Sequence, residues 1–321
     1  HALLEDKVVF NNLGLVVIDE QHRFGVAQRS KLWSKNKFPP HILVMTATPI
    51  PRTLSMTLYG DLEISIIDEM PPGRKEVKTV WRTDSNRLKV IGFIKEQIQA
   101  GRQIYIVFPL IKESEKLDYK NLMDGFESIQ RDFPLPKYQV SVVHGKMKPD
   151  DKEYEMKRFS DGITDIMIAT TVIEVGVNIP NASVMIIESA ERFGLSQLHQ
   201  LRGRVGRGAE QSYCILMSGN KISNEAKERL RTMVETNDGF KISEVDLRLR
   251  GAGDMMGTRQ SGSLEFKIAD LVKDHKILEY SRKVAIEILE NDENLSMPGN
   301  ENILKHYKIY SREKNIWNRI S

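Results

Sequence analysis

The sequence predicts an α/β protein built around a parallel sheet, and two observations support this. Short apolar runs rich in β-branched residues, such as residues 13–18 and 41–45, alternate with longer amphipathic segments, and each run ends in polar residues. The 321 residues are enough for about two domains. Repeated strand–helix units form a parallel sheet that helices cover on both faces, with ligands at the carboxyl ends of the strands.

The composition is that of a globular chain. It contains 40% hydrophobic and 28% charged residues with 12 Pro and 21 Gly, which excludes collagen-like, mucin-like and wholly disordered classes. The apolar runs are too short to cross a membrane. A single cysteine, Cys214, cannot form an intrachain disulfide or a cysteine-rich zinc site, so we expect a protein of the reducing cytoplasm. The net charge of +3 points to no particular partner, and any nucleic-acid site must be local.

The first region, residues 1–74, contains the two strands already named. A short helix is expected between them at residues 27–33, and the polar stretch 34–40 ends it. Met70-Pro71-Pro72-Gly73-Arg74 is the strongest cluster of breaking residues in this part of the chain. We place a domain linker there.

The second region, residues 75–218, contains a longer alternation. Strands are predicted at residues 77–82, 103–108, 139–143, 165–169, 183–187 and 212–217. Helices are predicted at residues 85–100, about 113–133, 149–160 and from about 196 onward. In the first of these helices Leu88, Ile91, Ile94 and Ile98 share a face, and Gly101 is placed to end it.

The third region, residues 219–321, is predicted to be mainly helical. Helices are expected at residues 224–235, 242–249 and 269–289, with a glycine-rich loop at residues 251–262. Residues 302–321 interleave basic side chains with Tyr307, Tyr310 and Trp317. This tail could bind nucleic acid by charge and stacking, but we favour a helix that packs its aromatic side chains inward.

An acidic pair directly follows the first predicted strand. Carboxylates such as those of Asp19 and Glu20 reach the sheet edge from that position, where they can hold Mg²⁺ through water and polarise an attacking water. Taken alone, such a pair is more often an ordinary turn. Thr46, Ala47 and Thr48 end the next strand and are expected to face the same crevice.

A glycine- and arginine-rich segment lies at residues 200–208. It contains three arginines, three glycines and no acidic residue. Arginines without acidic partners beside glycines typically bind anions, and phosphate is the expected anion; the alternative is a solvated basic turn. An arginine placed against a transferring γ-phosphoryl group stabilises spreading negative charge, which is worth on the order of 10³ to 10⁵ in rate.

Together these segments resemble the motifs of the RecG family of DNA branch-migration helicases, in superfamily 2. The resemblance covers His1 to about Asp274 and rests on residues 17–26 for motif II, 45–53 for motif III, 169–178 for motif V and 200–208 for motif VI. Residues 68–74 and 143–147 also follow the family pattern. It implies a RecA-like domain at residues 75–218, part of a first RecA-like domain at residues 1–74, and a mainly helical C-terminal region.

The resemblance implies roles for the matched residues. Asp19 would hold Mg²⁺ through water and Glu20 would orient or activate the attacking water, while Arg204 and Arg207, with Gln200 beside them, would reach the phosphates of ATP. Gly176 and Asn178 would lie near the nucleotide sugar; Asn178 stands where an aspartate is common, and it keeps an acceptor but loses the charge. The residues expected to link the nucleotide cleft to DNA or to the facing domain are Thr46, Thr48, Thr170 and Thr171, with Arg52 at a phosphate.

Residues 246–254 and 257–262 resemble the translocation motif that RecG proteins share with the transcription-repair coupling factor. The motif implies a helical hairpin and a loop that couple nucleotide state to movement on duplex DNA. Its candidate contacts are Arg248, Arg250, Arg259 and Gln260. Gln21-His22 and Arg259 before Gln260 favour the RecG family over the coupling factor.

The function implied is that of an ATP-dependent double-stranded DNA translocase or helicase that remodels stalled replication forks and Holliday junctions in repair and recombination. Its cofactors would be ATP and Mg²⁺, bound between two RecA-like domains. Its partner would be branched DNA and not a membrane, and the intact protein would be a monomer of the cytoplasm, associated with the nucleoid.

One motif is absent from the sequence. No G-x-x-x-x-G-K-[ST] phosphate loop occurs, since the Gly145-Lys146 pair is followed by Met147. Residues 1–3 also resemble the interior of a first motor domain. We therefore expect the chain to be the C-terminal part of a longer protein, inactive as an ATPase by itself. The alternatives are a translocase like the coupling factor, a non-enzymatic module that binds DNA or a partner, and, more remotely, a metal-dependent nuclease.

Overall fold

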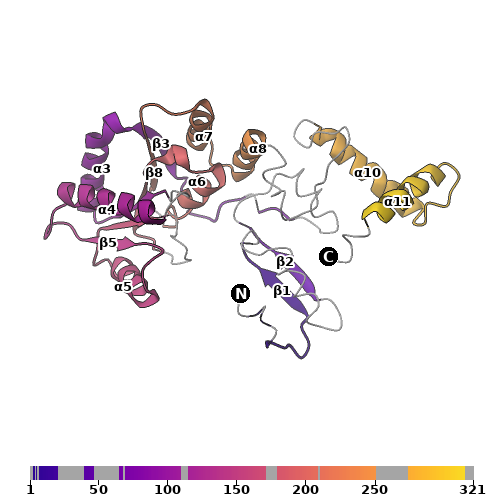
Figure 1. The fold of residues 1–321 in the computed structure, drawn as a ribbon, viewed down its shortest axis with the longest axis horizontal. Coiled ribbons are helices and arrows are strands. Elements are labelled where there is room, and N and C mark those ends of the chain that lie inside the picture. Colours follow the sequence, from indigo (N-terminus) through magenta and orange to yellow (C-terminus); the bar gives the residue numbers. More distant parts are fainter. Residues whose placement is uncertain are drawn as a thin grey trace. The chain divides into compact units, whose positions relative to one another are not determined.

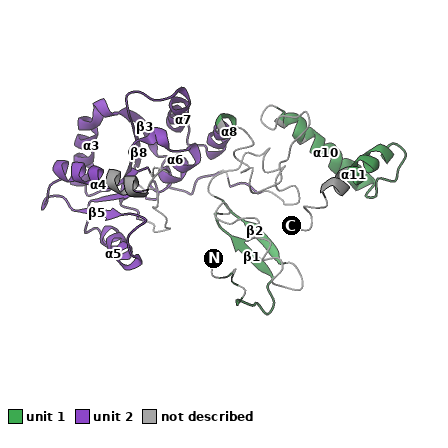
Figure 2. Ribbon diagram, viewed as in Figure 1, with its two compact units in different colours: residues 1–64, 247–321 green, residues 65–246 purple. Residues whose placement is uncertain are grey.

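The computed structural model describes residues 3, 5, 7–20, 40–46, 65–67, 69–109, 115–170, 179–208, 210–250 and 274–314 (Figure 1). The chain forms two compact units (Figure 2). The first, here named the terminal unit, comprises residues 1–64 and 247–321; the second, the sheet unit, comprises residues 65–246. The helix expected at residues 27–33 and the loop expected at residues 251–262 lie outside the described residues.

The described part of the sheet unit contains a six-stranded sheet with the order β3-β8-β7-β4-β6-β5, in which every neighbouring pair is parallel. The strands are β3 (Lys78–Thr83), β4 (Gln103–Phe108), β5 (Val140–Val143), β6 (Ile166–Thr170), β7 (Ala182–Ile187) and β8 (Tyr213–Ser218). These bounds lie within one residue of those predicted. The predicted α/β fold with a parallel sheet is confirmed.

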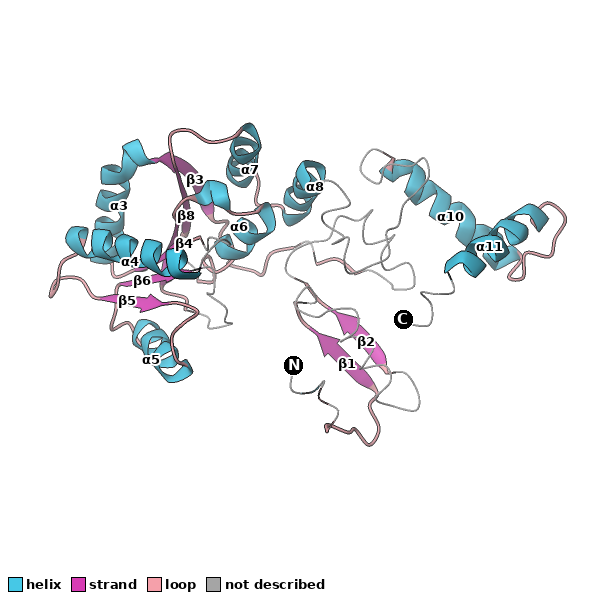
Figure 3. Ribbon diagram, in the orientation of Figure 1, coloured by secondary structure: helices cyan, strands magenta, loops and turns pink. Residues whose placement is uncertain are grey.

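Helices cover both faces of this sheet (Figure 3). They are α3 (Arg87–Gln99), α4 (Glu115–Asp132), α5 (Pro149–Ser160), α6 (Leu195–Arg202) and α7 (Asn224–Glu235), with short 3-10 turns at Asp84–Asn86 and Ala190–Arg192. The next helix, α8 (Gly239–Arg250), contains the chain boundary between the two units. Ile94 of α3 and Ile129 of α4 pack on Ile104 and Ile106 of β4. Tyr105 points to the opposite face, because successive strand residues alternate, and its ring lies 4.9 Å from that of Phe159 in α5.

The prediction for the core face of α3 was wrong at one position. Val90 and Ile94 are buried and Ile91 and Ile98 pack against the core, but Leu88 is 83% exposed. Leu88 belongs to the first turn of α3. The apolar face that contacts the sheet therefore begins at Val90, one turn into the helix.

The described part of the terminal unit contains a two-stranded parallel sheet of β1 (Leu15–Ile18) and β2 (His41–Val44). The register pairs Leu15 with His41 and Ile18 with Val44. Ile18 is buried and packs with Val16 and Ile42. The residues that follow the two strands therefore emerge at the same edge of this sheet, as the sequence predicts.

Two further helices of the terminal unit are α10 (His275–Asn291) and α11 (Glu301–Lys314). Asp292 organises their connection, since its carboxylate accepts hydrogen bonds from the backbone N–H groups of Ser296 and Met297 and from the Asn300 side chain. The predicted tail helix is present, but its aromatic side chains do not all point inward, because Tyr307 is 62% exposed. Over the described residues, the helices are too short or too polar for a membrane span.

Candidate functional site

The acidic pair forms a tight turn at the carboxyl end of β1. The backbone N–H of Glu20 donates to Oδ1 of Asp19 over 2.8 Å, and Glu20 has a left-handed φ of 50°. Asp19 is exposed and Glu20 is half-buried. This geometry fits the ordinary turn that the sequence left open, and it also leaves two carboxyl groups at the sheet edge, with the oxygen ligands that Mg²⁺ prefers.

Thr46 reaches the same edge from the neighbouring strand. The backbone N–H of Met45 donates to the carbonyl of Ile18 over 2.7 Å, so the pairing of the two strands continues up to the residue before Thr46. Thr48 and Arg52 lie outside the described residues.

The arginine-rich segment begins on α6 and ends in a loop. Leu195, Leu198 and Leu201 are buried and fasten α6 to the unit, while Gln200 is half-buried. The loop of residues 203–208, here named the arginine loop, is anchored by Val205, which is fully buried. On either side of Val205, Arg204 is half-buried and Arg207 is exposed.

Arg202 does not belong with the other two arginines. It is 3% exposed, and its Nη1 donates to the carbonyls of Met233 and Thr236, both at 2.9 Å. Its Nη2 donates to Nδ1 of His199 at 3.2 Å. The expectation that all three arginines are free to bind an anion is therefore wrong for Arg202, which instead holds the carbonyls at the C-terminal end of α7.

The positive charges of Arg204 and Arg207 act on Tyr105, whose side chain lies on the face of the sheet opposite the Ile104 face. Burial raises the pKa of Tyr105 to about 12, and the positive charges of Arg207 and Arg204 act against that rise. Within the described residues Arg207 forms no ion pair, and its Nε donates only weakly to the Gly203 carbonyl at 3.4 Å. An exposed guanidinium group without a carboxylate partner fits an anionic ligand such as phosphate.

Thr170 is the last residue of β6 and is 3% exposed. Its Oγ1 is buried and has no hydrogen-bond partner among the residues that the structure describes. A buried hydroxyl without a partner costs about 1 to 3 kcal/mol, so this position favours a partner from elsewhere. Thr171, Gly176 and Asn178, which follow in the sequence, are outside the described residues.

The segment that resembles the translocation motif starts on α8. Arg248 and Arg250 lie in the last turn of this helix, and the side chain of Arg250 is not described; Arg259 and Gln260 lie outside the described residues. Asp246, in the same helix, is 1% exposed and its Oδ2 accepts a hydrogen bond from Oγ of Ser196 at 2.9 Å. Because Ser196 belongs to α6, this contact joins the arginine-bearing helix to α8, and no local pattern in the sequence indicated it.

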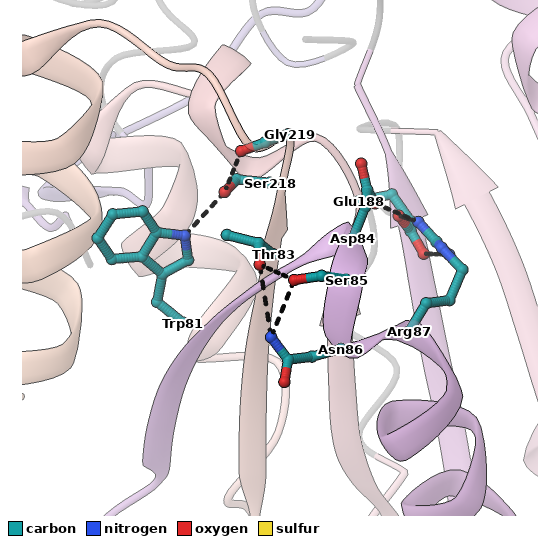
Figure 4. Close-up of polar contacts among 9 residues, drawn as sticks. All are labelled: Trp81, Thr83, Asp84, Ser85, Asn86, Arg87, Glu188, Ser218 and Gly219. Atoms are coloured by element: carbon teal, nitrogen blue, oxygen red, sulfur yellow. Dashed lines mark hydrogen bonds and ion pairs between the residues drawn. The ribbon is translucent and has the colours of Figure 1, made fainter.

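A polar cluster occupies the carboxyl ends of β3, β7 and β8 (Figure 4). Arg87 makes a bidentate ion pair with Glu188, at 2.8 and 2.9 Å, and its Nη2 also contacts Oδ1 of Asp84 at 2.9 Å. The pair with Glu188 raises the pKa of Arg87 above its ordinary value. Trp81 Nε1 donates to Oγ of Ser218 at 2.8 Å. The contacts of Arg87 fasten the N-terminus of α3 to the end of β7, and the bond of Trp81 joins β3 to β8; sequence reasoning missed both.

The donor set fits ATP and Mg²⁺ in part. Carboxylates on the terminal unit can hold a divalent cation, and guanidinium groups on the sheet unit can bind phosphate. No group of three or more His, Cys, Asp or Glu side chains among the described residues could hold a metal ion on its own. A magnesium ion would therefore need water and phosphate oxygens as further ligands, which is the usual way in which proteins bind it.

The chain is similar to two family models and to curated relatives. Residues 87–209 match the family model "Helicase conserved C-terminal domain", and residues 236–321 match "ATP-dependent DNA helicase RecG, domain 3, C-terminal". The chain is 51% identical over 292 residues to the ATP-dependent DNA helicase RecG of Bacillus subtilis, covering 91% of this chain and 42% of that protein. It is 50% identical over 294 residues to the RecG of Escherichia coli O157:H7, and the match covers 90% of this chain and 42% of that protein.

Solved structures give the same result. A structure of RecG bound to a three-way DNA junction matches with a TM-score of 0.66 and 44% identity, covering 87% of this chain and 35% of that chain. The Mycobacterium smegmatis helicase Lhr matches with a TM-score of 0.51 at 18% identity, over 70% of this chain and 31% of that one, which supports the fold alone. The chain thus spans about two fifths of the length of the curated relatives. From the two family models and the relatives of about 50% identity, we conclude that the chain belongs to the RecG family.

Proposed function

We propose that this chain is the motor portion of an ATP-dependent translocase on double-stranded DNA, which remodels stalled replication forks and Holliday junctions. The proposal rests on the arginine loop, where Arg207 is exposed and forms no ion pair within the described residues, while Arg202 is buried and donates to the Met233 and Thr236 carbonyls. The relatives are named ATP-dependent DNA helicases, and one of them is bound to a three-way DNA junction. Work on branched chromosomal DNA would take place in the cytoplasm, at the nucleoid.

In this proposal the residues of the chain divide the work on ATP. Bound ATP would supply the free energy of phosphoryl transfer to water, and Mg²⁺ would neutralise charge on its phosphates. Asp19 would hold the magnesium ion through water, and Glu20 would orient the attacking water and accept its proton. Arg204 and Arg207, with Gln200 beside them, would stabilise the negative charge that develops on the phosphates. Gly176 and Asn178 would contact the sugar.

The DNA contacts would be made to the phosphate backbone. The candidates on the sheet side are Thr170, the last residue of β6, and Thr171; the buried hydroxyl of Thr170, which lacks a described partner, supports this choice. Thr46, Thr48 and Arg52, and the translocation-motif residues Arg248, Arg250, Arg259 and Gln260, complete the set. Phosphate contacts carry no base information, so we propose binding that depends on salt and on DNA shape and not on sequence.

The decisive experiment measures fork-stimulated ATP hydrolysis in a full-length RecG-family protein that carries this chain. The chain alone is not suitable, because its 321 residues include no phosphate loop and we expect it not to hydrolyse ATP. Arg207→Ala should lower kcat by on the order of 100-fold or more, because the variant lacks the charge that stabilises the transferring phosphoryl group.

Arg82→Ala is the matched control. Arg82 is also an exposed arginine of the sheet unit, and its Nη1 donates a hydrogen bond to the Trp81 carbonyl at 3.0 Å. This control should hydrolyse ATP at the parent rate. Equal turnover in Arg207→Ala and the parent would refute the role proposed for the arginine loop.

A further inference from the structure

A segment near the N-terminal end of the sheet unit, residues 71–74, makes a turn next to the arginine loop. The N–H of Arg74 donates to the Pro71 carbonyl at 3.2 Å, and Gly73 has a φ of 80°, a left-handed conformation that glycine adopts without strain. Arg74 then directs its Nε to the carbonyl of Gly206, at 2.7 Å. The two residues are 132 positions apart in the sequence. The breaker cluster that the sequence marks as a linker therefore ends in a contact with the arginine loop.

The residues after Arg74 make further hydrogen bonds with Gln211 and Ser212. Gln211 Nε2 donates to the Glu76 carbonyl at 2.8 Å, and the N–H of Lys78 donates to the Ser212 carbonyl at 2.9 Å. Residues 74–78 therefore contact Gly206, Gln211 and Ser212, and the contact of Arg74 is the one that reaches the arginine loop itself.

At Gly206 the backbone of the arginine loop is held by a contact from outside the loop, the hydrogen bond from Arg74. It has a φ of 77°, and a Cβ there would lie 2.7 Å from Cγ2 of Val77, so only glycine fits the close approach. Glycine also has the widest choice of backbone conformations. Val205 is fixed by burial, but Arg207 on the other side is exposed. The Gly206 carbonyl belongs to the same peptide plane as the N–H of Arg207, so a hydrogen bond to this carbonyl sets the direction in which Arg207 leaves the loop.

We infer that Arg74 is a positioning residue, which holds the Gly206–Arg207 peptide and thereby presents Arg207 to its phosphate ligand. Its donor is charged, and charge-assisted hydrogen bonds are short and strong, as the 2.7 Å distance indicates. The inference rests on the proposed function for its consequence in catalysis. It adds that the linker entering the sheet unit and the arginine loop are held together, so that a displacement of the linker at Arg74 is transmitted to Arg207.

The first test needs no nucleotide and uses the chain as it is. Hydrogen exchange is measured on the amides of residues 203–212 in the parent, in Arg74→Ala and in Lys75→Ala. Arg74→Ala should speed exchange of the Val205 amide, which donates to the Arg202 carbonyl at 3.3 Å, by roughly tenfold or more, because local opening of the loop becomes easier. Lys75→Ala removes the same charge from the neighbouring residue and should leave exchange as in the parent. Equal exchange in Arg74→Ala and the parent would overturn the inference.

The second test measures fork-stimulated ATP hydrolysis in the full-length protein. Arg74→Ala should lower kcat by on the order of 10- to 100-fold with little change in KM for ATP, since small misplacements of a catalytic group cost rates of this size. Arg74→Lys should restore part of the rate, because an ammonium group can donate to the same carbonyl. In an Arg207→Ala background, Arg74→Ala should add less than about twofold, because coupled residues are not additive.

The outcomes separate this inference from the proposed function. If Arg207→Ala hydrolyses ATP at the parent rate, the proposed function fails. If Arg207→Ala is slow but Arg74→Ala is not, or if the two effects multiply in the double variant, the proposed function stands and the positioning role of Arg74 is overturned. If Arg74→Ala instead raises KM for ATP and leaves kcat unchanged, the positioning role is also overturned, because such a result would indicate weaker ATP binding in general.

Discussion

The two sheets of this chain are made from the same kind of sequence but bury it to different extents. Every residue of β6 and β7 in the six-stranded sheet is buried. In the two-stranded sheet Leu15, Val17 and Leu43 are 61%, 53% and 51% exposed. A run of β-branched and apolar residues therefore specifies a strand in both places, but burial requires layers on both faces of the sheet.

This difference bears on the candidate residues of each unit. Gln200 lies in α6 and Arg204 and Arg207 follow it, and Leu195, Leu198 and Leu201 of this helix are buried, so the backbone there is set within the sheet unit. Asp19 and Glu20 follow a strand with one buried residue, Ile18. We expect the arginines to be held more firmly than the acidic pair.

Matched leucine truncations test the comparison most strongly. Leu216 in β8 is fully buried and Leu15 in β1 is 61% exposed. Leu216→Ala should reduce the free energy of unfolding of the sheet unit by about 2 to 5 kcal/mol, through lost burial and the cavity left behind. Leu15→Ala should change the free energy of unfolding of the β1–β2 pair by at most about 0.5 kcal/mol. Native-state hydrogen exchange of β8 and β1 amides measures both free energies. Similar losses of stability in the two variants would contradict the difference in burial between the two sheets.

Acid should act on the two units in different pH ranges. Burial first, and then the charge of Arg202, lower the pKa of His199 to about 4, from 6.5. Between these values the unfolded chain binds a proton that the folded chain does not, so stability falls as the pH drops from 6.5 to 4, by up to roughly 3 kcal/mol. Urea unfolding of the sheet unit at pH 7 and pH 4.5 measures this, and His199→Gln should remove the difference.

The connection between α10 and α11 should withstand this range. Hydrogen bonds from the Asn300 side chain and the Met297 and Ser296 backbone lower the pKa of Asp292 to about 2, from 3.8. The stabilisation is therefore complete above pH 4 and is lost as the pH falls toward 2. Hydrogen exchange of the Ser296 and Met297 amides should stay slow at pH 4.5. Fast exchange at that pH, in a sample whose sheet unit is still folded, would contradict the prediction that this connection withstands acid better than the sheet unit does.

The smallest effect is expected from two helical glycines of the sheet unit. At Gly125 in α4 a Cβ would lie 2.5 Å from the Phe108 ring, whereas at Gly92 in α3 it would meet nothing within 4 Å. Gly125→Ala should therefore destabilise the unit by about 1 kcal/mol or more, because the ring must move. Gly92→Ala should stabilise it by about 0.5 to 1 kcal/mol, because alanine favours the helix. Urea midpoints that shift in the same direction would show that packing does not distinguish the two positions.

Local sequence features were sufficient for the elements of the fold. The bounds predicted for α5 and α7 are those of the structure, since Pro149 begins one helix and the Ser223 hydroxyl accepts a hydrogen bond from Ala226 N–H at the start of the other. The strands were found because their apolar runs are short and bounded by polar residues. The exposure of Leu88 was missed because helical periodicity does not show where a helix first meets the sheet.

The candidate site was predictable only in part. Parallel strands bring their carboxyl ends to one edge, which is why Asp19 and Thr46 could be picked out, whereas Thr170 was indicated by the resemblance to the RecG family. The different fates of Arg202 and Arg207 could not, because the Met233 and Thr236 carbonyls that bind Arg202 are 31 and 34 positions away. The pairs Arg74–Gly206 and Arg87–Glu188 span 132 and 101 positions. No periodicity within a short window contains such information.

The single thiol of the chain gives the sheet unit a built-in chemical reporter. Cys214 lies in β8, is fully buried, and burial raises its pKa to about 12, so at neutral pH the group is a protonated thiol shielded from solvent. A maleimide or aromatic disulfide reagent can reach it only when β8 separates from its neighbours. The labelling rate of an untagged sample therefore reports the opening of this sheet alone, with no competing signal from another cysteine.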